Sequence, residues 1–333
     1  MTDPSDRLTF FEREYPSANM VLIRGRRPVL VDTGFGSDLP TTEKLLREAS
    51  VPPEDLCLIV NTHYHSDHVG GNSGLQHRYG IPIATYRWDA NLVNRRDREV
   101  CSAEWLDQPV EPYEVTHPLS DGEEVNTGDT ILQALHTPGH TLGHVSLYVP
   151  DQQILILGDA VHGDDVAWIN PFREGIGALQ RALESLDKLA DLPVRRAYSG
   201  HGAAIEDLGA AIDSARRGYT KWLDDPQKAH WHGCKRIFAY ALMIGGGLSE
   251  KEVRPYLLGC PWFVDYARHG FGIEPEDFVE PLLAEMLRSG AAGWQGEKLV
   301  VLAPHSSPPA GWPSGPTRPK DWPKKPVRGS DPK

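Results

Sequence analysis

The sequence lacks the features that mark several classes of protein. Its 333 residues include four cysteines, none of them in a CxxC pair, which argues against a disulfide framework or a thiolate zinc knuckle. No apolar run approaches the ~20 residues that a membrane-spanning helix needs. The N-terminus has no basic stretch followed by an apolar one, as a signal peptide would have. We therefore expect a cytoplasmic protein with no membrane segment.

Basic charge is also scarce. Lys and Arg total 34 against 46 Asp and Glu, which gives a formal net charge of −12. Residues 303–333 hold six bases and two acids, so the acidic surplus belongs to the rest of the chain. An acidic body repels polyanions, which disfavours a nucleic-acid partner and favours a small-molecule substrate. Nothing in the sequence indicates an oligomeric state.

The chain divides into three zones by pattern. Residues 1–223 alternate short β-branched runs with helical periodicity, which is typical of a layered α/β domain. Residues 224–302 are mainly helical and end in a predicted two-stranded wing. Residues 303–333 contain nine prolines with Gly, Ser and Lys, a composition typical of a disordered tail.

The segment THYHSDH at residues 62–68 carries the chemistry. It follows the apolar run LCLIV, a predicted buried strand, and places three imidazoles and one carboxylate within six residues. Imidazole and carboxylate suit zinc, iron or manganese. His63 and His65 project the same way from extended chain, while Asp67 and His68 follow as the chain turns. Buried without a metal, these polar groups would cost desolvation energy with few partners, so the segment predicts a metal site.

Three later segments end predicted strands with further candidate ligands. HTPGH delivers His140, LILGD delivers Asp159, and YSGHG delivers His201. In each case an apolar strand runs into a turn flanked by glycine, and glycine lets backbone pack closely around a small ion. Any one of these residues alone is more typical of a cap or a surface position.

Taken together, these motifs resemble the metallo-β-lactamase superfamily. THYHSDHVGG is similar to its HxHxDH signature, and VLVDTG, HTPGHTLGH, LGDA and SGHG stand in the family's order over residues 17–205. The resemblance implies a four-layer αβ/βα sandwich with the site on loops at one edge, followed here by a small, mainly helical, winged-helix-like domain. It also implies two divalent metal ions, of which zinc is expected first, with iron or manganese as alternatives. The resemblance implies that His63, His65 and His140 bind the first metal. Asp67, His68 and His201 would bind the second, and Asp159 would bridge the two.

The ligand set also separates branches of the family. A bridging Asp and the absence of a Cys ligand argue against antibiotic hydrolysis. His65 stands where the diiron flavoproteins of the family have Glu, which argues against an oxygen reductase. The expected activity is cleavage of a small ester, thioester or lactone by a metal-bridging hydroxide, most similar to the glyoxalase II and acyl-thioesterase branch. Asp67 is the expected proton acceptor, and His162 a candidate donor to the substrate. Asp32 is expected either to brace a ligand loop or to cap a turn, and His144 to be structural.

Two other functions remain open at this point. One is a ribonuclease-type phosphodiesterase, since winged-helix relatives include RNA-cleaving enzymes, although the acidic charge opposes it. The other is a mononuclear iron sulfur dioxygenase, which keeps much of the same motif set. For the pocket walls, the sequence offers Trp88, Trp105 and Tyr113, and Trp168 and Phe172 after the bridging Asp. The resemblance to glyoxalase II implies basic residues in the C-terminal part that hold glutathione; Lys235 and Arg236 are available there, but their spacing is not diagnostic.

Overall fold

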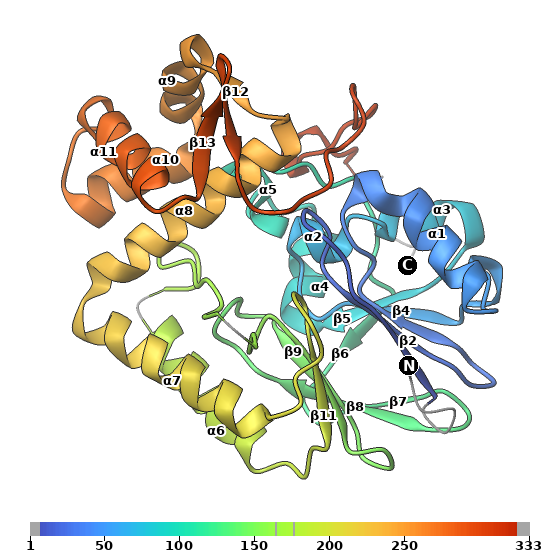
Figure 1. The fold of residues 1–333 in the computed structure, drawn as a ribbon. Coiled ribbons are helices and arrows are strands. Elements are labelled where there is room, and N and C mark those ends of the chain that lie inside the picture. The colour runs from blue at the N-terminus through green and yellow to red at the C-terminus, as the bar shows by residue number, and fades with distance from the viewer. Residues whose placement is uncertain (1–6, 164, 176, 325–333) are drawn as a thin grey trace, which may run out of the picture.

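Two β-sheets pack face to face and form the centre of the molecule (Figure 1). The structure, a computed structural model, describes residues 7–163, 165–175 and 177–324. The first sheet contains, in spatial order, β1 (Leu8–Phe11), β2 (Met20–Ile23), β3 (Val29–Val31), β4 (Leu58–Val60), β5 (Ile83–Tyr86) and β6 (His117–Leu119). The second contains β11 (Arg196–Ser199), β10 (Ile154–Gly158), β9 (Val145–Val149), β8 (Ile131–His136) and β7 (Glu124–Asn126). Both sheets mix parallel and antiparallel pairs.

The strands alternate between an inner and an outer apolar face. In β3, Val29 and Val31 belong to the core between the sheets, while Leu30 packs on the outer side. In β10, Ile156 faces inward and Leu155 outward. Successive side chains of a strand point to opposite faces, so strands buried on both faces are apolar throughout, as LCLIV and ILIL are.

Helices cover both outer faces. The first sheet is covered by α1 (Leu39–Glu48), α3 (Asn72–Tyr79) and α4 (Arg87–Asn94), and the second by α6 (Ala178–Ala190) and α7 (Leu208–Asp224). Helix α6 buries Ala182, Leu186 and Leu189 at helical spacing. The predicted four-layer sandwich is therefore confirmed.

The last third of the described chain is mainly helical, as predicted. It contains α8 (Pro226–Gly245), α9 (Glu250–Gly259), α10 (Pro261–Asp265), α11 (Pro275–Arg288) and a small sheet of β12 (Leu248–Ser249), β14 (Lys298–Val301) and β13 (Ala292–Gln295). An aromatic-rich core that includes Phe238, Trp262 and Phe278 holds these elements together. The winged-helix likeness and the domain boundary at residue 224 stay predictions. Helix α8 also contacts the N-terminal segment, since the Tyr240 hydroxyl donates to the Pro16 carbonyl at 2.8 Å.

The prediction of a disordered tail is wrong for residues 303–324. Trp322 is buried against Tyr113, and its indole N–H donates to the Val110 carbonyl at 3.0 Å. Trp312 packs on Phe35 with ring centroids 4.9 Å apart. Composition missed this because two tryptophans provide enough apolar surface to anchor a Pro-rich segment. Residues 325–333 lie outside the described residues.

No helix within the described ranges is long and apolar enough to cross a membrane.

Candidate metal centre

The HxHxDH segment connects β4 to a single helical turn. The chain leaves the sheet at Val60, bends at Thr62 and His63, and is extended at His65, the residue before α2 (Ser66–Val69). His63 and His65 therefore precede the helical turn, while Asp67 and His68 belong to it. The extended chain that the sequence predicted is found at His65 but not at His63.

Three imidazoles converge on one point. His65 Nδ1 lies 2.9 Å from His140 Nε2 and 3.1 Å from His63 Nε2, and the two Nε2 atoms are also 3.1 Å apart. Burial and neighbouring imidazoles lower the pKa of His65 to about 3, and burial lowers that of His140 to about 4. These rings are therefore neutral at physiological pH, which is the form that binds a metal.

A second group lies beside the first. His201 Nε2 is 3.3 Å from Asp67 Oδ2, and His68 Nε2 is 4.0 Å from the same oxygen. Asp67, His68 and His201 bring ligand atoms close enough together to hold one ion, as His63, His65 and His140 do. His63, His68 and Asp159 form a third set of ligand atoms that lie as close together. The structure thus brings the implied ligands into one cluster, and their assignment to two metals stays a prediction.

Asp159 stands between the two groups. Its Oδ1 is 3.3 Å from His68 Nε2, and its Oδ2 is 3.6 Å from His140 Nε2 and 3.7 Å from His201 Nε2. Gly200 is required beside it, because a Cβ there would lie 2.2 Å from Asp159 Oδ1.

Two of the ligand atoms lack a hydrogen-bond partner in the described part of the chain, and a bound metal ion would take its place. Within the described ranges, His68 Nε2 and Asp159 Oδ1 are buried with no hydrogen-bond partner. Buried polar atoms normally have one. Neutral imidazole and carboxylate are ligands that divalent cations accept, and the cluster can therefore hold them.

Hydrogen bonds behind the rings aim these atoms. Asp32, buried at the end of β3, accepts from His68 Nδ1 at 2.8 Å and from the Thr62 N–H at 2.8 Å. This leaves the other ring nitrogen of His68 facing the cluster, the arrangement that metal-bound histidines usually have. Asp32 has a φ of +58°, a left-handed backbone of the kind found at functional sites. The expected bracing role of Asp32 is confirmed.

His140 and His144 are held in the same way. His140 Nδ1 donates to the Trp168 carbonyl, which turns Nε2 toward the cluster. His144 bonds Thr137 through Nδ1 at 2.9 Å and accepts the Asp159 N–H through Nε2 at 3.0 Å. Both ring nitrogens of His144 are therefore hydrogen-bonded within the protein, which confirms its structural role.

His162 lies at the rim of the cluster. Its Nε2 is 3.5 Å from Asp159 Oδ1, and burial lowers its pKa. A neutral imidazole at this place can donate a hydrogen bond to a substrate in the pocket.

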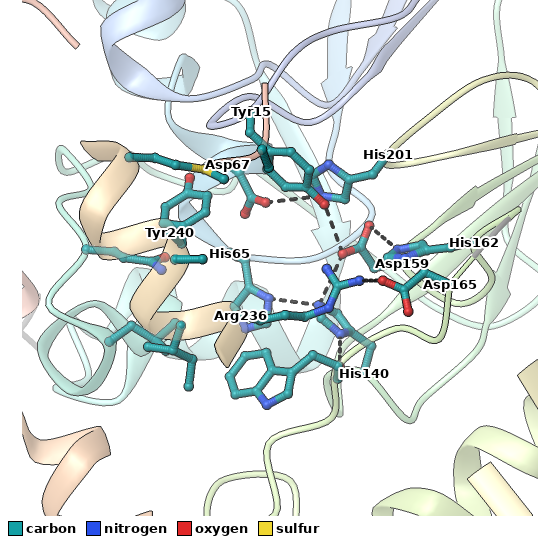
Figure 2. A pocket seen from close by; sticks show the side chains of 17 residues that line it. Tyr15, His65, Asp67, His140, Asp159, His162, Asp165, His201, Arg236 and Tyr240 are labelled. Atoms are coloured by element: carbon teal, nitrogen blue, oxygen red, sulfur yellow. Dashed lines mark hydrogen bonds and ion pairs between the residues drawn. The ribbon is translucent and has the colours of Figure 1, made fainter. Parts of the chain in front are cut away.

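The cluster opens into a cavity of about 300 Å³ (Figure 2), a size that suits a small molecule. Trp168 lines it, as predicted, whereas Phe172 packs against Trp105 and Tyr266, and neither Phe172 nor Trp105 is among the lining residues. Trp88 is half exposed and away from the cavity. Tyr113 belongs to the core beside Trp322.

Sequence reasoning missed most of the outer wall. Tyr15 stacks on His201 with ring centroids 4.6 Å apart, and α8 contributes Arg236, Tyr240 and Met243. The tail adds Ala303. No motif marks these positions, because the N-terminal segment, α8 and the tail reach the site only through tertiary packing.

Comparisons with known proteins agree with this architecture. The profile described as "Metallo-beta-lactamase superfamily" matches residues 15–201. The chain belongs to the metallo-β-lactamase superfamily. A solved structure of a metallo-β-lactamase family protein from Thermus thermophilus superposes with a TM-score of 0.58 at 24% identity, over 89% of this chain and 98% of that one. At this identity it shows the shared fold alone.

Two curated members of the superfamily are similar in sequence. Acyl-coenzyme A thioesterase MBLAC2 of Bos taurus is 32% identical over 53% of this chain and 72% of its own length. Hydroxyacylglutathione hydrolase of Hyphomonas neptunium is 26% identical over 56% of this chain and 66% of its own length. Both names describe hydrolases, which confirms the predicted enzyme class.

Proposed function

We propose that this chain is a binuclear metal-dependent hydrolase of small thioesters or related esters. The observation that carries the proposal is the convergence of seven His and Asp side chains, five of them buried and two partly buried, with Asp159 between two triads. His63, His65 and His140 would hold one ion, Asp67, His68 and His201 the other, and Asp159 both. Two zinc ions held there would supply a hydroxide nucleophile at neutral pH and polarise the substrate carbonyl.

Asp67 is the proposed proton acceptor. Burial raises its pKa, but His68 and His201 outweigh burial and bring the pKa below its ordinary value. The carboxylate is therefore ionised at neutral pH. It also lines the cavity, so it would face a substrate bound there.

His162 is the proposed hydrogen-bond donor to the substrate. Its ring is neutral and lines the cavity, and its Nε2 lies 3.5 Å from Asp159. A donor at this place would stabilise negative charge that develops on the substrate carbonyl oxygen.

The walls favour a thioester with an apolar acyl group. Leu106, Trp168, Ile237 and Met243 form an apolar side of the cavity. The names of the two curated relatives, a coenzyme A thioesterase and a hydroxyacylglutathione hydrolase, point to the same bond type.

A substrate panel tests the proposal. Zinc-loaded protein is assayed against thioesters, lactones, phosphodiesters, RNA and β-lactams, and we expect the highest kcat/KM on a thioester. Faster cleavage of RNA than of every small ester would overturn the ranking.

The variant Asp67→Ala tests the proposed proton acceptor. We expect it to abolish thioester turnover, whereas Asp191→Ala, at an exposed position after α6, serves as the matched control. An Asp67→Ala protein that keeps its kcat at full metal content would contradict the role.

A further inference from the structure

Trp168 connects the ligand cluster to the helical part of the chain. Its backbone carbonyl accepts the Nδ1–H of His140, the contact that turns the other ring nitrogen of this ligand toward the cluster. Its indole also lies beside two ligands, with ring centroids 5.9 Å from His65 and 6.2 Å from His140. Two of the three imidazoles in the triad of His63, His65 and His140 therefore border on this one residue.

The segment that carries Trp168 has no regular structure of its own. Between the end of β10 at Gly158 and the start of α6 at Ala178, the described residues form no helix and no strand. No ladder of backbone hydrogen bonds therefore fixes Trp168, and its place depends on the contacts of its own side chain. The indole is 9% exposed, so most of those contacts are inside the protein.

Tyr266 provides the polar contact of the indole. The Nε1–H of Trp168 donates to the Tyr266 hydroxyl at 3.1 Å. Tyr266 is fully buried and begins η4 (Tyr266–Phe271), a π-helical turn that follows α10. Such turns are rare and frequently occur at functional sites. Tyr266 does not line the cavity, so it can act on the site only from behind.

Gly233 of α8 leaves room for this hydrogen bond. A Cβ at position 233 would lie 2.1 Å from the Tyr266 hydroxyl oxygen and 2.8 Å from Trp168 Nε1. Any larger residue would therefore push donor and acceptor apart. Glycine inside a helix lowers the stability of that helix, and here it allows the contact. A buried N–H that loses its acceptor is unfavourable, so the hydroxyl favours one orientation of the indole.

We propose that Tyr266 is a positioning residue of the metal centre: through the Trp168 indole it fixes the carbonyl that orients His140. The route is short, because Trp168 carries both the indole and the carbonyl. The helical part of the chain then sets the metal affinity of one triad from behind, in addition to its place on the cavity wall. This inference rests on the proposed function, which assigns His140 to a metal ion.

Zinc affinity measured without substrate tests the inference. The first triad is isolated in a His201→Ala background and the second in a His140→Ala background, and each is titrated with zinc in competition with a chelator. We expect Tyr266→Phe to weaken zinc binding at the first triad by about 3- to 10-fold, since loss of a direct partner of a ligand typically costs about 10- to 100-fold. At the second triad the change should stay below about 2-fold.

Tyr148→Phe is the matched control. Tyr148 is buried on the outer side of β9, away from the cavity, and its hydroxyl donates to the Pro193 carbonyl at 2.8 Å. Its loss should lower stability and leave the zinc affinity of both triads unchanged. Equal losses at the two triads in Tyr266→Phe would overturn the inference, and so would zinc affinities in Tyr266→Phe that match those of Tyr148→Phe.

A double-variant cycle tests the route through the indole. Trp168→Phe removes the donor of the hydrogen bond and keeps the backbone carbonyl. Because the hydroxyl acts through the indole, Tyr266→Phe should change zinc affinity by less than about 2-fold in the Trp168→Phe background. A full effect of Tyr266→Phe in that background would contradict the proposed route.

A measurement on the metal-free protein keeps this inference separate from the proposed function. With isotope-labelled histidine, nitrogen NMR shows which ring nitrogen of His140 carries the proton. We expect the proton on Nδ1, facing the Trp168 carbonyl, and a larger share of the Nε2–H form in Tyr266→Phe than in Tyr148→Phe. If the wild-type protein binds no zinc, the proposed function fails, yet this share still decides the role of Tyr266. Equal shares in the two variants would then overturn it.

Discussion

The floor and the outer wall of the cavity differ in origin and in construction. The floor is the cluster of His and Asp side chains on loops at strand ends of the sandwich, of which His65, Asp159 and His201 line the cavity. Hydrogen bonds to Asp32 and to the Trp168 carbonyl hold its imidazoles from behind. The outer wall comes from the N-terminal segment, α8 and the tail, with Tyr15, Arg236 and Met243. All residues of the floor belong to the sequence motifs of the family, while the wall depends on how the N-terminal segment, α8 and the tail pack against the sandwich. We therefore expect separate parts of this chain to carry the reaction chemistry and the substrate choice.

Removal of the bridging carboxylate should have the largest effect on the floor. Asp159→Asn keeps the shape but removes the negative charge between the two triads. We expect kcat/KM on the best thioester to fall by about 10³-fold or more, with a lower zinc content by elemental analysis. Asp191→Asn is the matched control. Unchanged turnover in Asp159→Asn would show that the floor does not carry the chemistry.

The next change weakens the floor from behind. Asp32→Asn replaces the carboxylate that accepts from His68 Nδ1, so the ring loses its charged acceptor. We expect about 10- to 100-fold weaker binding of metal at the second triad, measured by competition with a chelator. The exposed position Asp55 provides the control, Asp55→Asn. Equal metal affinity in the two variants would show that Asp32 does not brace the site.

A change in the wall should alter selectivity instead. Met243→Ala enlarges the apolar side of the cavity, and we expect the preference between long and short acyl groups to change by about 10-fold. Zinc content should stay the same. Leu287→Ala, an exposed leucine of α11, is the control. A loss of zinc in Met243→Ala would mean that floor and wall are not separable.

The smallest effect on chemistry is expected at the tail anchor. Trp322→Ala removes a buried indole, and we expect about 3 kcal/mol less stability toward urea, with the kcat of the folded protein nearly unchanged. The half-exposed Trp88 is the matched position, and Trp88→Ala should change stability by about 0.5 kcal/mol at most. Equal effects of the two variants would contradict the packing of residues 303–324.

The sequence predicted the floor far better than the wall. HxHxDH and the strand-end His140, Asp159 and His201 could be identified because metal ligands need fixed residue types at fixed places in the chain. The four layers followed from apolar runs and helical periodicity. Tyr15 and Arg236 could not be placed, since their positions depend on long-range packing that leaves no local pattern. The prediction of a disordered tail was wrong for residues 303–324, because it relied on the proline content and overlooked two tryptophans that pack against the domain.

The number of metal ions on the floor can be measured directly. A crystal of the zinc-loaded protein, with anomalous data collected above and below the zinc edge, shows how many ions each chain holds and which residues bind them. We expect two zinc peaks about 3.5–4 Å apart. One is bound by His63, His65 and His140, the other by Asp67, His68 and His201, with Asp159 between them. A single ion per chain, or a peak away from these side chains, would contradict a binuclear floor.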